Sequence, residues 1–355
     1  MPRNTGTIVG IDLLRFFAAL LVMGFHLTFW GWSAPGQPTG LALRGAASFP
    51  ALGEYFKSGW VGVEIFFVIS GFVISLTAEN RSSRQFLISR ASRLLPAIWL
   101  CATITLIIQV INHSHSYPYL LSYYLKSLIL FPIGPWIDVV YWTLPIEVLF
   151  YSMIAALLYF HGLKYIRGLA VTIAAVSISC SVAQSNDVFF LSYGCCFSLG
   201  IAFWLLTKRL TLVDIILSLL FFLGALFQIS RLRIYTEVEQ IVALFIFSTA
   251  MIMMVFSLSM QKWIIENLPQ RFLRMVRQVG LATYPLYLIH NVVGATLLRW
   301  IVSIGATETV SLWISVAFCV SLAFVISSFA EPIIKKRYFM DPSAKHNASL
   351  EPAAN

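Results

Sequence analysis

The stretch at residues 10–30, GIDLLRFFAALLVMGFHLTFW, is long and apolar enough to cross a membrane as one helix, yet it carries ionisable side chains. An ionisable group in hydrocarbon is costly, so each of them needs a partner or a function. Arg15 and His26 are eleven residues apart, about three helical turns, which places both on one face and separates them by roughly 16 Å along the axis. The stretch therefore predicts a membrane helix with one polar stripe.

A structural alternative needs no function at all. Asp12 and Arg15 have the i, i+3 spacing of a helical ion pair, which would lie near one membrane surface. His26 would then lie in the opposite headgroup region, where water satisfies its ring nitrogens. The rest of the chain favours the functional interpretation, because it supplies more buried charges of complementary sign.

The composition excludes an ordinary soluble protein. Hydrophobic residues make up 59% of the chain and charged residues only 11%, whereas a soluble domain has about 25% charged residues. The formal net charge of +9 comes from basic residues in short segments between apolar runs, the pattern of membrane topology rather than of nucleic-acid binding. We therefore expect a multi-pass integral membrane protein with the lipid bilayer, and no nucleic acid, as its partner.

The apolar runs predict an all-α polytopic helical bundle of about ten transmembrane helices. The expected spans are residues 10–30, 59–78, 94–111, 139–160, 168–184, 188–206, 210–230, 240–260, 279–303 and 309–334. Together they define a membrane domain over residues 1–340. Residues 341–355 are expected to form a disordered cytoplasmic tail.

The lysines and arginines orient these spans. Of the 24 basic residues, seventeen fall on one side if the N-terminus is cytoplasmic: Arg3, Arg81, Arg84, Arg90, Arg93, Lys164, Arg167, Lys208, Arg209, Lys262, Arg271, Arg274, Arg277, Lys335, Lys336, Arg337 and Lys345. Cytoplasmic segments carry the excess of basic residues. The sequence therefore predicts that both termini are cytoplasmic.

Two outer connections are long. The segment 31–58 is rich in Gly, Pro and Ser, and would either cover an outer cavity as a lid or act as a plain connector. The segment 112–138 contains YPYLLSYYLKSLILFP, which is too short to span the membrane and would form an interfacial or re-entrant helix, or again a connector.

Further polar residues lie in the apolar runs. Glu64 lies near the outer end of the second span, and Arg90 and Arg93 lie one turn apart at the inner mouth of the third. An RxxR pair at a helix start suits the capture of phosphate, although the positive-inside rule explains the two arginines equally well. Glu147, in the fourth span, needs a partner at its depth, and His26 is the expected one.

Six motifs in order resemble the acyltransferase-3 family of membrane acyltransferases, which O-acetylate or otherwise O-acylate cell-surface sugars. They are IDLLRFFAALLVMGFH with Arg15 and His26, GVEIFFVISGF, the RxxR of Arg90 and Arg93, WTLPIE ending in Glu147, GLATYPLYLIH ending in His290, and EPIIKK. The resemblance covers nearly the whole chain. Two positions depart from the family pattern: Glu64 stands where aspartate is more frequent, and Leu14 stands where glycine usually precedes the arginine.

The resemblance implies an acyl-CoA donor, most often acetyl-CoA, on the cytoplasmic side, no metal, and a glycan or lipid-linked sugar acceptor such as exopolysaccharide or lipopolysaccharide outside. It implies residence in the bacterial cytoplasmic (inner) membrane, as a homo-oligomer or with polysaccharide-assembly partners. Some members carry an extracytoplasmic hydrolase-like domain, for which this sequence has no segment. Transfer to the acceptor is therefore expected within the membrane domain or through a partner.

The following roles are expected on that basis. His26 carries out the chemistry, either as the base that deprotonates the acceptor hydroxyl or as the carrier of the acyl group, and Glu147 orients its ring. Arg90 and Arg93 hold the CoA phosphates and Arg15 lines the acyl path. The expected substrate-binding residues are Glu64, Tyr287 and His290. The rival interpretation is a proton-coupled transporter or flippase, which also uses buried Arg, His and Glu.

Overall fold

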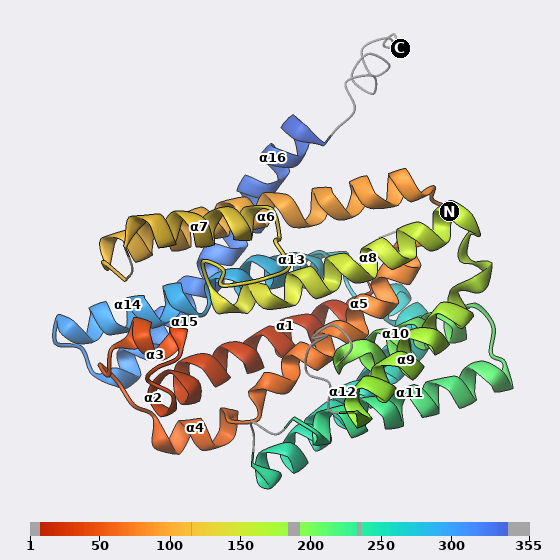
Figure 1. The fold of residues 1–355 in the computed structure, drawn as a ribbon, viewed down its shortest axis with the longest axis horizontal. Helices are drawn as coiled ribbons and strands as arrows, with labels where there is room; N and C mark the ends of the chain where they lie inside the picture. Colours follow the sequence, from red (N-terminus) through yellow and green to blue (C-terminus); the bar gives the residue numbers. More distant parts are fainter. Residues whose placement is uncertain (1–7, 115, 184–191, 233–235, 340–355) are drawn as a thin grey trace.

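The computed structural model describes residues 8–114, 116–183, 192–232 and 236–339, and within these ranges the chain is helical, without strands (Figure 1). The long helices run side by side as one bundle, with α1 in its middle. The elements in chain order are α1 (Val9–Gly24), η1 (Phe25–Trp30), α2 (Gly31–Ser33), α3 (Pro38–Leu43), α4 (Pro50–Phe56), η2 (Gly59–Val61), α5 (Gly62–Ala78), α6 (Ser83–Ile111), α7 (Tyr117–Leu128), η3 (Val139–Trp142), α8 (Thr143–Phe160), η4 (Leu163–Tyr165), α9 (Ile166–Val182), α10 (Gly194–Lys208), α11 (Leu212–Ser230), α12 (Glu237–Asn267), α13 (Gln270–Ile289), α14 (Val292–Ser303), α15 (Glu308–Val325), η6 (Ile326–Ala330) and α16 (Glu331–Tyr338).

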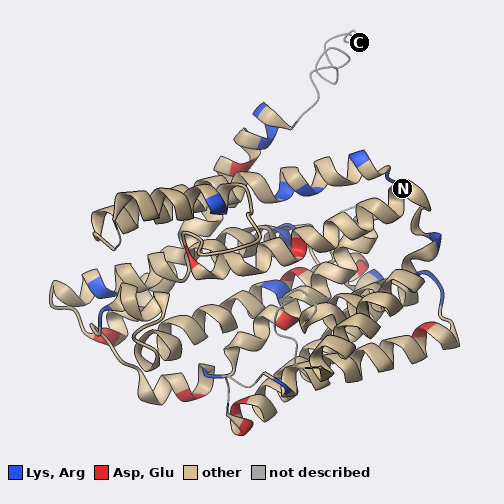
Figure 2. Ribbon diagram, viewed as in Figure 1, with Lys and Arg blue, Asp and Glu red and all other residues tan. Residues whose placement is uncertain are grey.

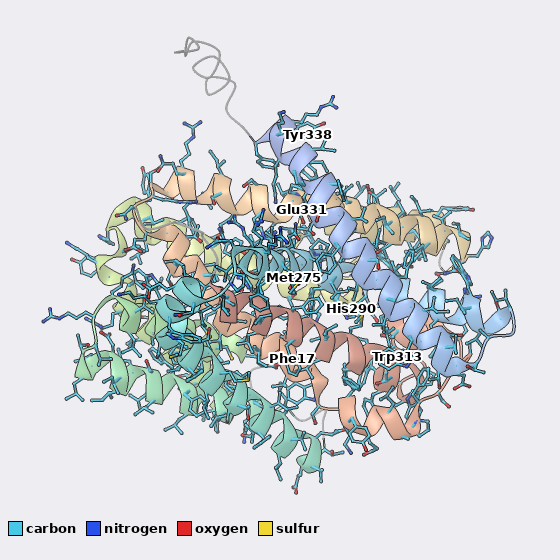
Figure 3. The ribbon with its side chains drawn as sticks, turned by 180° about the vertical axis from the view of Figure 1, so that it is seen from behind. Phe17, Met275, His290, Trp313, Glu331 and Tyr338 are labelled. Atoms are coloured by element: carbon cyan, nitrogen blue, oxygen red, sulfur yellow. The ribbon has the colours of Figure 1, made fainter. Side chains whose placement is uncertain are left out.

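The predicted all-α membrane bundle is confirmed. By length and composition, the described residues contain eight helices able to cross a membrane, and nine if the bent pair of α13 and α14 counts as one span. The remaining expected span corresponds to α10, an apolar helix of 15 residues. Its expected start at residue 188, like the tail at 341–355, lies outside the described residues. The large exposed apolar side chains suit contact with lipid: Phe17 is 56% and Trp313 61% exposed (Figure 3).

Two expected spans differ from the helices observed. The third, expected at 94–111, begins eleven residues earlier at Ser83, because Ser82 and Gln85 form a capping box that stabilises an earlier helix start. Arg90 and Arg93 therefore lie inside a helix rather than at its first turn. The ninth, expected at 279–303 as one helix, is instead broken between Ile289 and Val292, where the axis bends by 72°.

The connections sort into two groups as predicted. Polar contacts join segments that were expected on the same side of the membrane. On one side Arg93 contacts Glu331, Lys208 contacts Glu79 and Arg167 contacts Asp214. On the other side Ser48 contacts Glu308, Ser58 contacts Glu239, and Asn112 accepts from both Arg44 and Arg299. We call these the inner and outer sides. That the inner side is cytoplasmic, and with it both termini, stays a prediction.

Close approach of α5 and α10 depends on glycine. A Cβ atom on Gly71 would collide with the carbonyl oxygen of Phe197, and one on Gly200 with the carbonyl oxygen of Val68. Both obstacles are backbone atoms, which cannot move aside as a flexible side chain can. The two glycines therefore allow direct backbone contact between these helices, as small residues do in membrane bundles.

The two long outer segments have distinct structures. Residues 31–58 form α2, α3 and α4, of which α3 packs against α14. α7 packs along α6, and the hydroxyl groups of Tyr124 and Thr103 are 2.9 Å apart. Because Thr103 lies eight residues before the end of α6, α7 reaches about 12 Å down that helix from its outer end. This arrangement fits a re-entrant helix better than one lying flat on the membrane.

Candidate active site

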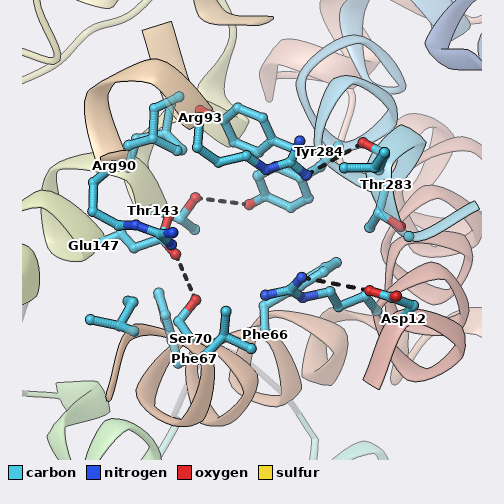
Figure 4. Close-up of a pocket in the computed structure, with 18 of the residues that line it drawn as sticks. Asp12, Phe66, Phe67, Ser70, Arg90, Arg93, Thr143, Glu147, Thr283 and Tyr284 are labelled. Carbon is cyan, nitrogen blue, oxygen red and sulfur yellow. Dashed lines mark hydrogen bonds and ion pairs between the residues drawn. The ribbon is translucent and has the colours of Figure 1, made fainter. Parts of the chain in front are cut away.

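Polar residues from five helices enclose an inner cavity of about 340 Å³, which lies between α1, α5, α6, α8 and α13 (Figure 4). Figure 2 shows charged residues in the interior of the bundle as well as at the helix ends. The polar lining residues are Asp12, Arg15, Ser70, Arg90, Arg93, Thr143, Glu147, Tyr151, Arg277, Thr283, Tyr284 and Tyr287. Such a set of ionisable groups inside an apolar bundle indicates a binding site.

The cavity has an excess of positive charge, with four arginines against two carboxyl groups. A guanidinium nitrogen of Arg15 lies 3.9 Å from the Asp12 carboxylate, so the ion pair of the structural alternative is present, but inside the cavity wall. Arg93 pairs with the buried Glu331 at 3.6 Å and lies over the ring of Tyr284. Nε of Arg90 is buried without a hydrogen-bond partner among the described residues. The site is therefore suited to an anionic ligand.

Glu147 belongs to this cavity and not to His26. Its Oε1 accepts a hydrogen bond of 2.6 Å from the hydroxyl of Ser70 (Figure 4). The hydrogen-bond partners of the His26 ring are instead the Val22 carbonyl oxygen and His290. The structure thus places Glu147 in the arginine-lined cavity, where α8 and α5 hold its carboxyl group, and pairs it with Ser70 instead of the expected His26.

The two imidazoles form a direct pair. Nε2 of His290 is 3.0 Å from Nδ1 of His26, and the ring centroids are 5.0 Å apart. His26 lies in η1, a π-helical turn that continues α1, and His290 ends α13 at the helix break. π-helical turns and broken helices in membranes recur at functional sites. His26, on the polar face of the first span, therefore contacts His290 where one helix has a π-helical turn and the other is broken.

Tyr287 connects the histidine pair to the inner cavity. Its side chain lines the cavity, and its ring centroid is 5.7 Å from that of His290 one turn later. The hydroxyl of Thr143 is 3.3 Å from the Tyr287 hydroxyl, and the Phe66 ring packs edge-on against the tyrosine. These three residues form the end of the cavity nearest the histidines.

An outer cavity of about 640 Å³ lies beyond the helix break. It is lined by residues of the first outer segment between 35 and 45, by Gln109 near the end of α6, and by Tyr123, Trp136 and Asp138 of the second outer segment. Val292, two residues after His290, also lines it. The segment 31–58 therefore borders an outer cavity, and its interpretations as a lid and as a plain connector both stay predictions.

Asp138 fixes the helix break. Its carboxylate accepts hydrogen bonds from the Asn291 side chain at 2.7 Å and from the Val292 backbone N–H at 2.9 Å. The Oδ1 atom of Asn291 accepts in turn from the Thr39 hydroxyl at 2.6 Å. Burial raises the pKa of Asp138, while its N–H donors act in the opposite direction. The carboxyl group thus accepts from the Val292 backbone N–H, which the interrupted helix leaves without an intrahelical partner, and also holds the Asn291 side chain.

Replacing Asp138 with alanine is expected to lower the melting temperature of the detergent-solubilised protein and to reduce its activity. The Asn291 and Val292 donors would be buried without an acceptor, which costs about 1–3 kcal/mol each. The matched control is Glu308→Ala, which removes an exposed carboxylate that accepts from the Ser48 backbone on the same side. Equal melting temperatures for the two variants would refute the structural role of Asp138.

The remaining predicted residues are only partly brought together. Arg15, Arg90, Arg93 and Tyr287 line the inner cavity with Glu147, and His290 lies beside His26. His290 is fully buried and lines neither cavity. Glu64 is 3% exposed, lies outside both cavities, and has one carboxyl oxygen without a hydrogen-bond partner among the described residues. Its expected contact with substrate therefore has no counterpart in the cavities.

Sequence reasoning missed two groups. Arg277 lines the inner cavity, although its place in a basic run predicted only a topology signal. The amphipathic register of α13 offered a clue, since Arg277, Tyr284 and Tyr287 follow helical spacing on one face. Asp138 gave no comparable signal, because its partners at the helix break, Asn291 and Val292, are more than 150 residues away.

The comparisons with known proteins identify the family. The family model described as "Acyltransferase domain" matches residues 8–330, which is most of the chain. The chain therefore belongs to the acyltransferase-3 family, as its motifs predicted. No solved structure matches it.

Curated relatives match parts of the chain. It is similar to the exopolysaccharide production protein ExoZ of Rhizobium meliloti (strain 1021), with 30% identity over 154 residues, 40% of this chain and 47% of that protein. It is similar to the peptidoglycan O-acetyltransferase OatA of Listeria monocytogenes, with 31% identity over 29% of this chain and 14% of that protein. Nodulation protein 10 of Rhizobium leguminosarum is 35% identical over 28% of this chain and 24% of that protein. The chain thus spans less than half the length of each of these relatives.

Proposed function

We propose that this protein is a membrane O-acyltransferase that moves an acetyl group from cytoplasmic acetyl-CoA to a hydroxyl group of a cell-surface glycan. The glycan is an exopolysaccharide, a lipopolysaccharide or a lipid-linked precursor, and the membrane is the bacterial cytoplasmic (inner) membrane. The observation that carries the proposal is the order of sites along α13 and α14. An arginine-lined cavity, a histidine pair and an outer cavity follow one another from Arg277 to Val292.

The inner cavity is the proposed donor site. The phosphates of CoA are held by Arg90, Arg93 and Arg277, since guanidinium groups bind phosphate through paired N–H donors. The slender pantetheine arm then passes Arg15 and carries the thioester toward Tyr287. Glu147 lies among these cations, where it positions the guanidinium groups rather than the imidazole.

The outer cavity is the proposed acceptor site. Trp136 and Tyr123 provide aromatic surface, and Gln109 and Arg44 provide polar groups at its edge. A sugar presents both an apolar face and hydroxyl groups, so a mixed lining of this kind suits it. The bend between α13 and α14 separates this cavity from the donor site, with the histidine pair between them.

The chemistry is assigned to His26. In direct transfer its ring takes the proton from the acceptor hydroxyl while the oxygen attacks the thioester carbon. The C–S bond breaks, and the CoA thiolate leaves and receives the proton. In the covalent version the ring nitrogen attacks the thioester carbon, the C–S bond breaks and CoA leaves as its thiolate. The acceptor oxygen then attacks the acetyl carbon, the C–N bond to the imidazole breaks, and the hydroxyl proton passes to the CoA thiolate.

The names of the relatives support the substrate class. One is named for exopolysaccharide production and another for peptidoglycan O-acetylation. Both names describe glycans at the cell surface, and the second names the acetyl group. The family of this chain is thus consistent with the direction of transfer that the two cavities suggest.

The test is a transfer assay on the purified full chain in nanodiscs, with [14C]acetyl-CoA and the membrane polysaccharide fraction of the expression host as acceptor. The expected result is release of free CoA together with label in the polysaccharide. The rival, a transporter or flippase, gains some support from the broken α13 and α14 pair, a feature of transporters. Movement of a sugar across proteoliposomes without CoA release would favour the rival and reject the acyltransferase.

A further inference from the structure

We propose that His290 is a positioning residue that fixes the tautomer of His26, so that Nδ1 of His26 carries the proton and Nε2 is the atom that meets the substrate. This inference rests on the proposed function, because it assigns the reactive atom of the same site. It replaces two expectations from the sequence, namely that His290 binds substrate and that Glu147 orients the reacting imidazole.

The first step is the tautomer of His290 itself. Its Nδ1 lies 2.9 Å from the backbone oxygen of Tyr287 and 3.3 Å from that of Leu286. A carbonyl oxygen can only accept, so Nδ1 must be the protonated nitrogen. In a neutral imidazole one nitrogen donates and the other accepts. Nε2 of His290 is therefore a hydrogen-bond acceptor.

The second step transfers this constraint to His26. Its Nδ1 is 3.0 Å from Nε2 of His290 and also 3.0 Å from the backbone oxygen of Val22. Both neighbours are acceptors, so Nδ1 of His26 carries a proton that the two share. The opposite assignment would place two unprotonated nitrogens against carbonyl oxygens. The neutral ring of His26 thus has its free electron pair on Nε2.

Burial separates the roles of the two rings. The side chain of His290 has no exposed surface, whereas His26 is partly exposed. Neither ring lines a cavity, but His26 is the one of the two with exposed surface, so the contact with an acceptor hydroxyl or a thioester is assigned to His26. His290 acts through the hydrogen bond to its neighbour.

The pair also provides for the charge that the reaction creates. When Nε2 of His26 takes the hydroxyl proton, the ring becomes an imidazolium whose Nδ1–H points at the electron pair of His290. That hydrogen bond stabilises the cation, as the carboxylate does in the hydrolytic triad, but with a neutral partner. In the covalent version Nε2 carries the acetyl group, and the same bond holds the Nδ1 proton until CoA has left.

The backbone around His290 fixes the position of this acceptor. The residue after it, Asn291, is held by Thr39 and Asp138, and Asp138 also holds the Val292 N–H. The backbone at His290 is therefore held in place, and the hydrogen bond from its Nδ1 to the Tyr287 carbonyl oxygen orients the ring. His26 in turn meets a partner of fixed orientation.

The kinetic test compares His290→Leu with His290→Gln in the transfer assay. Leucine removes the acceptor, and kcat is expected to fall about 100-fold or more with the KM for acetyl-CoA unchanged. Glutamine can present Oε1 near the position of Nε2, and kcat is expected to stay within about tenfold of the wild type. Equal losses in both variants, or a change confined to KM, would overturn the proposal.

The spectroscopic test needs no variant of His290. Ring-15N-histidine protein in nanodiscs is measured by solid-state NMR, and the His26 signals are identified by their absence from His26→Ala. The expected result is a protonated Nδ1 and an unprotonated Nε2 on His26. A protonated Nε2 in the neutral ring would disprove the assignment even if every variant folded poorly.

The two tests also separate this inference from the proposed function. If the wild-type protein transfers no label, the proposed function fails; if the wild type is active and His26→Ala retains full transfer, the chemistry is not at His26 and its tautomer has no catalytic meaning. If His26→Ala is inactive while His290→Leu has wild-type kcat, only the role of His290 fails.

Discussion

Replacement of His26 by alanine is expected to abolish acetyl transfer, with kcat at least about 100-fold below the wild type, because a positioned base contributes about 10²–10⁴-fold and a nucleophile cannot be replaced by water in the same geometry. Binding of acetyl-CoA should not change, since the ring lies beyond Tyr287 and outside the inner cavity. The measurement is steady-state transfer of labelled acetyl groups, together with the dissociation constant of acetyl-CoA for each variant.

The matched control for that experiment is His161→Ala. His161 is exposed at the end of α8 and lines neither cavity. It should transfer acetyl groups at the wild-type rate. A His26→Ala protein with wild-type kcat, or an equal loss in the control, would contradict the assignment of the chemistry to His26.

The double variant Arg90→Ala, Arg93→Ala is expected to raise the KM for acetyl-CoA by about 10-fold to 100-fold. Each charge-assisted hydrogen bond to phosphate contributes about 1.5–3 kcal/mol, and about 1.4 kcal/mol corresponds to a factor of ten. The loss should be smaller than two independent contributions, because Arg93 is already paired with Glu331 and Arg277 remains in the cavity.

The phosphate assignment is tested with S-acetyl-pantetheine, which carries the thioester but no phosphate. The wild type should strongly prefer acetyl-CoA over this compound, and the double variant should lose most of that preference with little change in its KM for S-acetyl-pantetheine. Arg84→Ala is the control, because Arg84 lies on α6 outside the cavity and contributes the same inner charge. If the preference persists, the two arginines act as topology signals only.

Much of the fold could be predicted because the ability of a segment to span a membrane depends on the residues of that segment alone. The hydropathy and length of each run decide whether it enters the bilayer, so nearly every expected span has a helix at its place. The inner and outer groups of polar contacts follow from the same count of spans. The spacing of Arg15 and His26 likewise placed both side chains on the side of α1 that meets α13.

The partners of the buried polar groups could not be predicted in this way. Glu147 and His26 have comparable expected depths, but α5 brings Ser70 to the carboxylate and α13 brings His290 to the imidazole. Depth along a helix is encoded in the sequence, whereas the direction of a side chain within the bundle depends on how several helices pack.

The helix break after His290 makes the distinction clearest. The sequence by itself determined an apolar run over 279–303 long enough to span, and a histidine motif within it. Only the tertiary structure decided that this run bends by 72°. Asp138, from a distant segment, stabilises the broken turn because it accepts from the Val292 backbone N–H, which a continuous helix would have paired internally, and from the Asn291 side chain.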